Sequence, residues 1–357
     1  MKSLDLLRVL LLPFVPVYAL VTWVRNMLFD KGIFKSTAVE RPVISVGNLT
    51  VGGSGKTPLV IFLAELFKKN GLQPGVVSRG YGRTTKGYLL VADNSGIRRT
   101  PEESGDEIYQ TAVECAIPAA VGEKRVEAVS GILKETGVGC VILDDAYQHR
   151  WIQRDVNLLI IAQRFLVDEN PLRRTLFPTG NLREPFNRAE RADAVIINRK
   201  FTEKKEIPER LLRHFRGKKI FNAWYEPLYF VDIKNGKHYD PADFTGQKSL
   251  CVSGIANPYS FFSALQQLKI NTDNKMIFID HKAYSVKEVE KIRKLFYSTN
   301  AFSVVTTQKD AVKLAKFSRE LDDIDIYYLK IRLRLDEEKE FEQFILDKIK
   351  ATNKKTS

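Results

Sequence analysis

A glycine-rich segment that ends in a lysine and a threonine is the strongest chemical signal in the sequence. Residues 42–58 read PVISVGNLTVGGSGKTP, and an apolar-periodic stretch follows from Leu59 to Lys69. The pattern predicts a strand, a loop and a helix, with loop N–H groups and the helix dipole around phosphate oxygens. Lys56 should reach the β- and γ-phosphates of ATP, and Thr57 should ligate Mg²⁺. The residues expected to bind the nucleotide are Gly52, Gly53, Ser54, Gly55, Lys56 and Thr57.

The loop departs from the strict GxxxxGK[ST] pattern, because Thr50 stands where that pattern has its first glycine. A glycine-rich turn between a strand and a helix would explain Gly52 and Gly53 without any ligand. It gives no reason for Gly-Lys-Thr at the start of a helix, so phosphate binding is the better interpretation.

Two adjacent acidic residues strengthen the prediction of a nucleotide site. The run from Val138 to Leu143 has the composition of a buried strand, and Asp144 and Asp145 follow it. P-loop enzymes hold Mg²⁺ or its water at a carboxylate at the end of a buried parallel strand. A single acid there could merely cap the next helix. The pair, together with the upstream Gly-Lys-Thr, favours metal binding by Asp144 and Asp145.

Length and composition predict two folded domains, because 357 residues that are 44% hydrophobic can build more than one core. The net charge of +13 attracts anions, which could be nucleic acid, an acidic membrane surface or a phosphorylated substrate. The basic residues are spread along the chain without zinc-finger, basic-zipper or RNA-binding motifs, which argues against nucleic acid. The cysteines form no CxxC pair, so we expect buried thiols in a reducing compartment, at Cys115, Cys140 and Cys251.

An uncharged apolar run lies between Arg8 and Arg25 and contains Pro13 and Pro16. A cleaved signal peptide is disfavoured because no small-x-small cleavage site follows the run. A buried helix of the core is the ordinary explanation of such a run. We favour a third interpretation, a segment embedded in the membrane interface or just spanning it, with basic residues towards anionic lipid. Because the two prolines would kink or break a helix, a bent, shallow insertion fits better than a straight span. The run is shorter than the roughly 20 residues of a straight spanning helix.

Beyond these single motifs, the sequence resembles the tetraacyldisaccharide 4′-kinase family over nearly its whole length. The family typically has Gly-Phe where this chain has Ala146-Tyr147, and Glu where it has Gln308. Both differences are conservative in size or polarity. The blocks that carry the resemblance are Gly47–Pro58, Ser78–Arg83, Ser104–Glu107, Asp144–His149, Phe177–Pro185, Gly254–Pro258, Asp280-His281 and Thr307–Asp310.

The resemblance implies a kinase that uses ATP and Mg²⁺ to phosphorylate the 4′-hydroxyl of a tetraacyldisaccharide 1-phosphate, a lipid A precursor. It implies a place at the cytoplasmic face of the bacterial inner membrane, with the lipid precursor and the membrane surface as partners. Neither a nucleic acid nor a protein partner is expected. The implied fold is an α/β P-loop domain with a mainly parallel sheet, joined by a two-stranded β-ribbon to a smaller C-terminal α/β domain. The implied fold also includes an N-terminal membrane-associated helix.

The sequence itself indicates where these parts lie. Asn235-Gly236 favours a tight hairpin turn between Ala223–Asp232 and Lys237–Tyr239, which would form the ribbon. Ser249–Ser253 is typical of a strand and Pro258–Lys269 of a helix. We therefore predict an N-terminal segment at 1–30, a kinase domain at 31–222, a ribbon at 223–242, a C-terminal domain at 243–350 and a basic tail at 351–357.

Further catalytic roles follow from the resemblance. Asp106 is the implied base for the 4′-hydroxyl, Glu107 helps to hold Mg²⁺, and His281 pairs with Asp106 and tunes it. Lys56 completes the implied catalytic set. The alternative for Asp106 and Glu107 is charge that complements the dipole at a helix start.

Guanidinium groups suit phosphate oxygens, so several arginines are candidates to contact ATP or the 1-phosphate of the substrate. Arg79 and Arg183 lie inside the family blocks, whereas for the others a solvated surface charge is an equal alternative. The predicted substrate-binding residues are Arg79, Tyr81, Arg125 and Arg183. The residues whose roles stay open are Arg83, His149 and Lys309.

A different class of protein, the nucleotide-driven switches and partition ATPases, also combines a membrane segment with a nonstandard P-loop. Those proteins have a second lysine early in the loop, where this chain has Thr50 and Val51. They would also leave Asp106 and Glu107 without a function. A kinase of another lipid-linked sugar is the second alternative.

Overall fold

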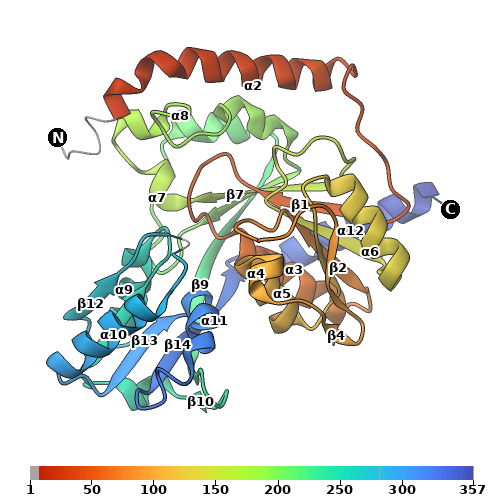
Figure 1. Cartoon of the computed structure of the whole chain (residues 1–357). Helices are drawn as coiled ribbons and strands as arrows, with labels where there is room; N and C mark the ends of the chain where they lie inside the picture. The colour runs from red at the N-terminus through yellow and green to blue at the C-terminus, as the bar shows by residue number, and fades with distance from the viewer. Residues whose placement is uncertain (1–7, 281, 357) are drawn as a thin grey trace. The chain divides into compact units, whose positions relative to one another are not determined.

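The computed structural model of the chain describes residues 8–280 and 282–356, which form two compact units (Figure 1). The first unit contains the chain up to Arg199, the segment Lys204–Ala223 and the residues from Leu335 onwards. The second contains Lys200–Glu203 and Trp224–Arg334. Both units combine a parallel sheet with helices, which confirms the predicted α/β fold class.

The first unit is built on a mostly parallel β-sheet. Its strands are β1 (Val43–Gly47), β2 (Pro74–Ser78), β3 (Leu89–Asp93), β4 (Gly96–Ile97), β5 (Ala119–Val121), β6 (Cys140–Asp144), β7 (Val156–Ala162), β8 (Ala194–Asn198) and the first part of β9 (Lys219–Asp232). They follow the order β9-β8-β7-β1-β6-β2-β5-β3-β4, and each neighbouring pair from β9 to β5 is parallel. Strand β3 runs antiparallel to β5, and β4 to β3. The carboxyl ends of β1, β6 and β7 therefore meet at one edge, where α/β sheets bind ligands.

Helices and short 3₁₀ turns connect these strands. They are η1 (Leu12–Phe14), α2 (Val15–Asp30), α3 (Lys56–Lys69), α4 (Pro101–Ser104), α5 (Asp106–Cys115), α6 (Arg125–Thr136), α7 (Gln163–Leu166), η2 (Pro171–Arg174), η3 (Phe186–Arg191), α8 (Glu209–Leu212), η4 (Arg213–Phe215) and α12 (Glu338–Thr356). All residues of β1, β6 and β8 are buried, because helices cover a parallel sheet on both faces. The register partners Val43 and Val141 pack with Ile132 of α6, for example. Phe341 of α12 contacts Phe62 of α3 with ring centroids 5.9 Å apart.

The second unit has a smaller sheet with the strand order β12-β11-β13-β14, in which each pair is parallel. Its elements after β9 are β10 (His238–Tyr239), η5 (Pro241–Phe244), β11 (Ser249–Ser253), α9 (Pro258–Gln267), β12 (Asn274–Ile277), α10 (Val286–Ser298), β13 (Ser303–Thr307), α11 (Gln308–Leu314), η6 (Ala315–Phe317) and β14 (Ile326–Leu335). The predicted strand Ser249–Ser253 is confirmed. The helix predicted from Pro258 ends at Gln267 rather than at Lys269.

The predicted hairpin around Asn235-Gly236 is present. Strand β10 pairs antiparallel with the end of β9, with His238 opposite Val231. Gly236 has a φ of 70°, in the left-handed region that such a turn requires and that glycine adopts without strain.

Strand β14 adds a pairing that the sequence did not indicate. In the strand order β14 lies beside β9. The N–H of Ile233 donates to the carbonyl oxygen of Ile326 at 3.0 Å, and that of Asp336 donates to Asn222 at 2.9 Å, so the two strands run in opposite directions. The chain passes from the first unit to the second along β9 and returns along β14.

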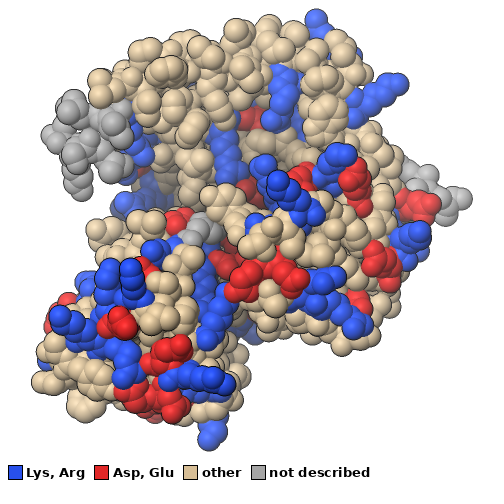
Figure 2. All heavy atoms as spheres, in the orientation of Figure 1, with Lys and Arg blue, Asp and Glu red and all other residues tan. Residues whose placement is uncertain are grey.

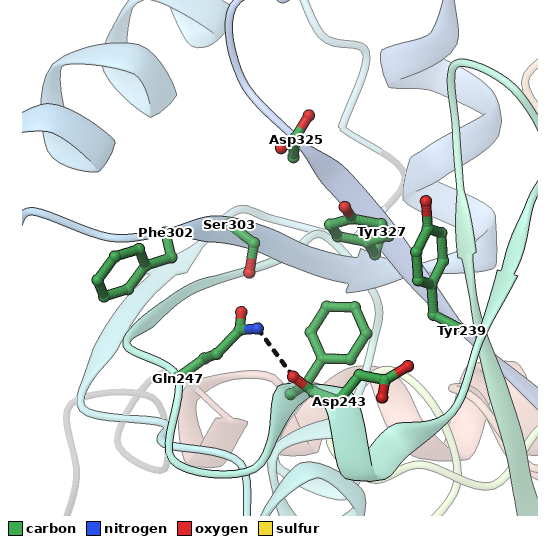
Figure 3. A pocket seen from close by; sticks show the side chains of 8 residues that line it. Tyr239, Asp243, Gln247, Phe302, Ser303, Asp325 and Tyr327 are labelled. Atoms are coloured by element: carbon green, nitrogen blue, oxygen red, sulfur yellow. Dashed lines mark hydrogen bonds between the residues drawn. The ribbon is translucent and has the colours of Figure 1, made fainter.

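A pocket of about 450 Å³ in the second unit is lined by aromatic and acidic side chains (Figure 3). Tyr239 and Tyr327 meet edge to face there, with ring centroids 5.3 Å apart. Ser303 and Asp325 line the pocket at the amino ends of β13 and β14. Ligands of parallel α/β sheets bind at the opposite, carboxyl ends of the strands. We therefore assign no ligand to this pocket.

Helix α2 exposes a row of large apolar side chains. With the turns before it, it forms a helical segment, Arg8–Asp30, that is long and apolar enough to cross a membrane, and only 6% of its most apolar window is buried. This low burial excludes the interpretation as a core helix. Pro13 lies in η1 and Pro16 in the first turn of α2, so the helix is interrupted at its entry and the prolines cost no internal hydrogen bond. Figure 2 shows few charged side chains on the outer surface of this segment. Its exposed large apolar residues are Val9, Leu10, Leu12, Phe14, Val17, Leu20, Val21 and Trp23.

A larger residue at Gly47, the last residue of β1, should destabilise the protein. A Cβ atom at this position would lie 2.6 Å from both the backbone N and the Cβ of Tyr147. Gly47→Ala should therefore lower the free energy of unfolding by about 1–3 kcal/mol, the usual cost of overpacking. Thermal or denaturant unfolding measures the effect. Gly139→Ala is the matched control, because its new Cβ would meet nothing closer than 3.7 Å. Equal losses in the two variants would contradict the argument.

Candidate active site

The glycine-rich loop joins β1 to α3 and contains two glycines with positive φ. Gly52 has a φ of 102° and Gly55 a φ of 104°, in the left-handed region that other residues rarely adopt. Gly55 precedes the first residue of α3, so the predicted helix start at Lys56 is confirmed. The first N–H groups of α3 have no partners within the helix and, with its dipole, attract anions.

Three polar side chains for which the sequence predicted no role hold this loop by hydrogen bonds: Asn48, Gln148 and Asn198. Ser54 is 2% exposed, and its hydroxyl accepts a hydrogen bond from Asn48 Nδ2 at 3.0 Å. The carbonyl oxygen of Ser54 accepts another from Asn198 Nδ2 at 3.0 Å, and Gln148 Nε2 donates to the carbonyl oxygen of Asn48 at 2.8 Å. Asn198 ends a buried apolar strand, as Asp144 does, and that position was the available signal.

Lys56 and Arg183 converge on Asp145. The Lys56 ammonium lies 3.5 Å from Asp145 Oδ1, and Arg183 Nη1 donates to the two carboxylate oxygens at 2.8 and 3.1 Å. Burial raises the pKa of Asp145, but the charges of Lys56 and Arg183 outweigh that effect and hold the pKa below its usual range. The Asp145 side chain is 33% exposed, so this ion-pair cluster borders solvent.

The pKa of Asp144, the residue before Asp145, is shifted in the opposite direction. Asp144 is 2% exposed, and its Oδ1 has no hydrogen-bond partner among the described residues. Burial, followed by the negative charge of Glu107, raises the pKa of Asp144 to about 7 against the opposing effect of Lys56. A buried carboxylate without a partner is costly, so this position is electrostatically incomplete and suits a cation.

Burial also shifts the pKa values of two basic side chains, Arg125 and His149. Arg125 is 3% exposed, and its Nη1 donates to the carbonyl oxygen of Gly122 at 2.6 Å. Burial lowers the pKa of Arg125 to about 10 although Asp144 and Asp145 oppose the shift, so the guanidinium stays charged at neutral pH. Burial, followed by the charge of Arg125, lowers the pKa of His149 to about 4. The His149 imidazole is therefore neutral, and its Nε2 has no partner within the described part of the chain.

The acidic residues fit a Mg²⁺ ion held mainly by phosphate oxygens and water. Residues 8–280 and 282–356 contain no group of three or more His, Cys, Asp or Glu arranged for a metal ion. Mg²⁺ in nucleotide enzymes usually binds one or two carboxylates together with substrate phosphates. The unpartnered Oδ1 of Asp144 can supply one such ligand, and Thr57, in the first turn of α3, has the hydroxyl for another.

Arg79 and Tyr81, which the sequence predicted to bind the substrate, follow strand β2. Arg79 comes directly after β2 with an exposed side chain, and its charge contributes to the lowered pKa of His149. Tyr81 is 68% exposed. The structure therefore brings Arg79 to the edge of the nucleotide site, whereas the Tyr81 ring extends into solvent.

Asp106 and Glu107 are the first two residues of α5. Gly105 precedes them with a φ of 96°, and a Cβ there would lie 2.9 Å from the carbonyl oxygen of Tyr81. Glycine thus allows the sharp turn that places the two acids at a helix start. The effect of Glu107 on the pKa of Asp144 places this acid near the strand β6 carboxylate. His281, predicted to pair with Asp106, lies outside the described residues.

Two residues with open roles have partners in the structure. Arg83 Nη2 donates to Glu123 Oε1 at 2.6 Å, so it supports the loop after β5. Lys309 belongs to the second unit, where its ammonium lies 3.9 Å from Asp280 Oδ1.

The parallel sheet, the glycine-rich loop before α3 and the acidic pair after β6 define an α/β P-loop nucleotide-binding protein. The profile of the family described as Tetraacyldisaccharide-1-P 4'-kinase matches residues 7–350. The chain belongs to this family, which confirms the resemblance drawn from the sequence blocks.

Individual relatives agree with this membership. The Tetraacyldisaccharide 4'-kinase of Desulfatibacillum aliphaticivorans is 34% identical over 345 residues, which cover 93% of this chain and 90% of the relative. The protein of the same name from Flavobacterium johnsoniae is 35% identical, with 97% and 98% covered. The crystal structure of LpxK from Aquifex aeolicus in complex with ATP superposes with a TM-score of 0.78 and 31% identity, over 96% of this chain and 99% of that one.

Neutralising Asp144 should stabilise the protein in the absence of ligands. The pKa of Asp144 is raised to about 7 in the folded state, so the folded protein binds this proton more tightly than the unfolded chain does. Stability is therefore lost as pH rises from the ordinary carboxyl range near about 4 up to that raised pKa. Asp144→Asn should raise the melting temperature at pH 8 by about 2–4 °C for each kcal/mol recovered. The gain should shrink at pH 5.

Asp145→Asn is the matched control and should act with the opposite sign. The pKa of Asp145 is lowered in the folded state, so its ionised form stabilises the protein above the ordinary carboxyl range and this stability is lost in acid. Asp145→Asn should lower the melting temperature at pH 8, because the ion pairs with Lys56 and Arg183 are lost. Changes of the same sign in both variants would refute the electrostatic difference between the two carboxylates.

Proposed function

We propose that this chain transfers the γ-phosphoryl group of ATP to the 4′-hydroxyl of a tetraacyldisaccharide 1-phosphate, a precursor of lipid A. The observation that carries the proposal is the Lys56–Asp145–Arg183 cluster beside Asp144, whose Oδ1 has no hydrogen-bond partner among the described residues. These residues accompany a P-loop in a chain that matches this kinase family over residues 7–350. The solved ATP complex of the Aquifex aeolicus relative supports ATP as the donor.

The reaction joins the 4′-oxygen to the γ-phosphorus and breaks the bond between that phosphorus and the β–γ bridging oxygen, so that ADP leaves. In the proposed mechanism the N–H groups of the loop bind the phosphates. Lys56 exchanges its partner Asp145 for a phosphate oxygen, and Arg183 stays near enough to neutralise charge on the transferred group. Mg²⁺, held by Thr57, Asp144, Asp145 and Glu107 together with phosphate oxygens, would supply further charge neutralisation.

The proton of the 4′-hydroxyl needs an acceptor, and Asp106 is the proposed base. It starts helix α5, next to Glu107, whose charge reaches Asp144. Adjacent residues at a helix start point about 100° apart, so one acid can face the acceptor while the other faces the metal. His281 is proposed to tune Asp106, on the resemblance alone.

The proposed site of action is the cytoplasmic face of the bacterial inner membrane. The acceptor carries four acyl chains and stays in the bilayer, so the enzyme has to work at its surface. Helix α2, with its exposed apolar face and little burial, suits insertion into the membrane interface. The net charge of +13 would add attraction to anionic lipid.

A direct assay separates this function from the alternatives. Purified protein is incubated with Mg·ATP and the disaccharide 1-phosphate, and the mass of the acceptor is followed. Gain of one phosphate is the expected result. A switch or partition ATPase would release phosphate without modifying any acceptor, and a kinase of another lipid-linked sugar would leave this acceptor unchanged.

Lys56→Ala should lower turnover at least about 10²-fold, the loss typical of removing one charge-stabilising donor. The fold should persist, because the change removes one ion pair with Asp145 and none of the buried apolar side chains. Product formation and the melting temperature are measured together. Lys69→Ala is the matched control at the other end of α3, where the lysine side chain is 73% exposed, and it should keep wild-type turnover. Full activity of a folded Lys56→Ala variant would exclude the P-loop mechanism.

Asp106→Asn and Glu107→Gln should separate the base from the metal ligand. Loss of a positioned base typically lowers turnover by about 10²–10⁴-fold, so Asp106→Asn should reduce kcat by that order with little change in the affinity for Mg·ATP. Glu107→Gln should instead raise the Mg²⁺ concentration needed for half-maximal activity. Magnesium titrations of both variants make the comparison. A weakened Mg²⁺ response in Asp106→Asn would reassign that residue to the metal.

A further inference from the structure

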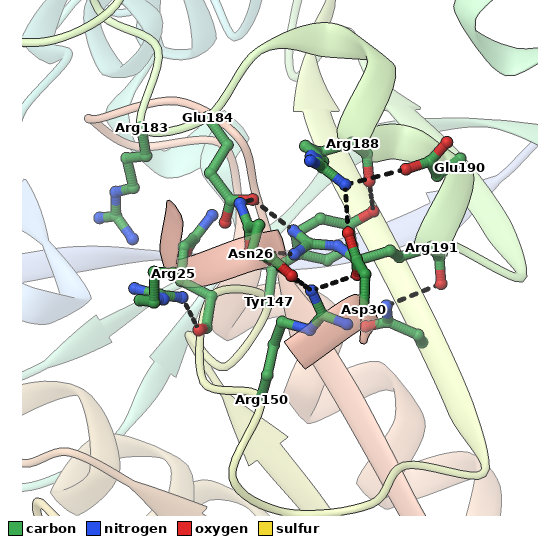
Figure 4. A network of polar contacts seen from close by, with 12 residues as sticks. Arg25, Asn26, Asp30, Tyr147, Arg150, Arg183, Glu184, Arg188, Glu190 and Arg191 are labelled. Atoms are coloured by element: carbon green, nitrogen blue, oxygen red, sulfur yellow. Dashed lines mark hydrogen bonds and ion pairs between the residues drawn. The ribbon is translucent and has the colours of Figure 1, made fainter. Parts of the chain in front are cut away.

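The inner face of helix α2 carries polar side chains that contact two loops of the nucleotide site (Figure 4). Tyr18 Oη donates to the carbonyl oxygen of Arg183 at 3.0 Å, and Arg25 Nη2 donates to the carbonyl oxygen of Gln148. The outer face of the same helix is apolar and exposed. One helix therefore offers one side to lipid and the other to the loops around Asp145.

Asn26 is the central residue of this inner face and is 1% exposed. Its Nδ2 donates to Glu184 Oε2 at 3.0 Å, and its Oδ1 accepts hydrogen bonds from Arg191 Nη1 at 3.1 Å and from Arg150 Nη1 at 3.4 Å. Arg191 Nη2 also donates to Glu184 Oε2, at 2.7 Å. The three side chains of Asn26, Glu184 and Arg191 thus close a buried ring of hydrogen bonds, in which each bond is strengthened by low local polarity.

This ring touches both segments that hold the catalytic cluster. Glu184 directly follows Arg183, the partner of Asp145. The Arg191 guanidinium lies 4.8 Å from the centre of the Tyr147 ring, in the loop that follows Asp145. Removing Asn26 would leave Glu184 and Arg191 with one partner fewer each. Glu184 adjoins Arg183 in the sequence, and Arg191 contacts the loop that follows Asp145.

Asp145 needs external support because its backbone is strained. Its φ is 49°, a left-handed conformation that costs roughly 1 kcal/mol in a residue with a side chain and persists only where the surroundings enforce it. The carbonyl oxygens of Ala146 and Tyr147 accept hydrogen bonds from Arg154 Nη1 at 3.3 and 3.1 Å. The next support along this loop is the bond from Arg25 to Gln148, which comes from α2.

We infer that Asn26 and Arg25 are positioning residues, through which the polar face of the membrane-associated helix holds Asp145 and Arg183 in the arrangement that phosphoryl transfer needs. The inference rests on the proposed function and gives α2 a second role beside membrane attachment. It also implies that displacement of α2 at the membrane changes the geometry around the P-loop lysine.

Asn26→Leu tests this role, because it keeps the side-chain volume and removes the hydrogen bonds. The enzyme is assayed in detergent micelles with Mg·ATP and the disaccharide 1-phosphate. Its kcat should fall at least about tenfold, since a displacement of about 1 Å at a reacting centre costs up to about 10²-fold. Binding to vesicles of phosphatidylethanolamine and phosphatidylglycerol should stay close to that of the wild type, because the outer face of α2 is unchanged.

Leu20→Asp is the matched control on the outer face of the same helix, where Leu20 is 59% exposed. It should weaken vesicle binding, the property that Asn26→Leu leaves close to that of the wild type. The two variants would then separate the attachment role of α2 from its positioning role.

A double-mutant cycle distinguishes positioning from general stabilisation. If Asn26 acts through Arg183, adding Asn26→Leu to an Arg183→Ala enzyme should cause little further loss of kcat. Losses that multiply would show that Asn26 acts independently of Arg183, and they would overturn the inference, as would an unimpaired kcat in folded Asn26→Leu. Should Asn26→Leu not fold, Asn26→Asp replaces it, since the isosteric carboxylate keeps the acceptor for Arg191 and removes the donor to Glu184, and its kcat should fall in the same way. A wild-type enzyme that forms no phosphorylated product would instead overturn the proposed function.

Discussion

The difference in charge environment between Asp144 and Asp145 is the constraint on which the rest of the site depends. Lys56 and Arg183 neutralise Asp145, whereas Asp144 is buried and its Oδ1 has no partner among the described residues. Two adjacent carboxylates in one small volume repel each other unless positive charge is supplied. Here Lys56 and Arg183 outweigh burial at Asp145, whereas the charges of Lys56 and Arg125 do not outweigh it at Asp144. The other carboxylate remains available for a cation, at a cost in stability that function can justify.

The parallel sheet makes this arrangement possible. Residues that are far apart in sequence follow neighbouring strands and therefore meet at one edge: the glycine-rich loop after β1, the acids after β6 and Asn198 at the end of β8. Buried side chains then fix the loop before any ligand arrives, since Asn48 and Asn198 both bind Ser54. Such preorganisation reduces the reorganisation needed during phosphoryl transfer.

In the proposed function, helix α2 connects the site to the membrane. Its exposed apolar face and its buried Asn26 belong to opposite sides of one amphipathic segment, and the polar side reaches the strained Asp145 loop and the Arg183 segment. For an enzyme whose acceptor stays in the bilayer, an anchor that also supports the catalytic residues keeps the reacting groups at a defined depth. Attachment and chemistry would then depend on the same helix.

The sequence by itself determined the local features of this protein. Gly-Lys-Thr at a helix start, the buried strand before Asp144 and the hairpin at Asn235-Gly236 depend on residue type and short spacing, and the structure contains all three. Asn26 and the pairing of β9 with β14 could not be foreseen, because a lone asparagine or an apolar run carries no information about its distant partner. The unlike states of Asp144 and Asp145 were also hidden, since two identical neighbouring residues differ only in the burial and the charges that tertiary packing places around each of them.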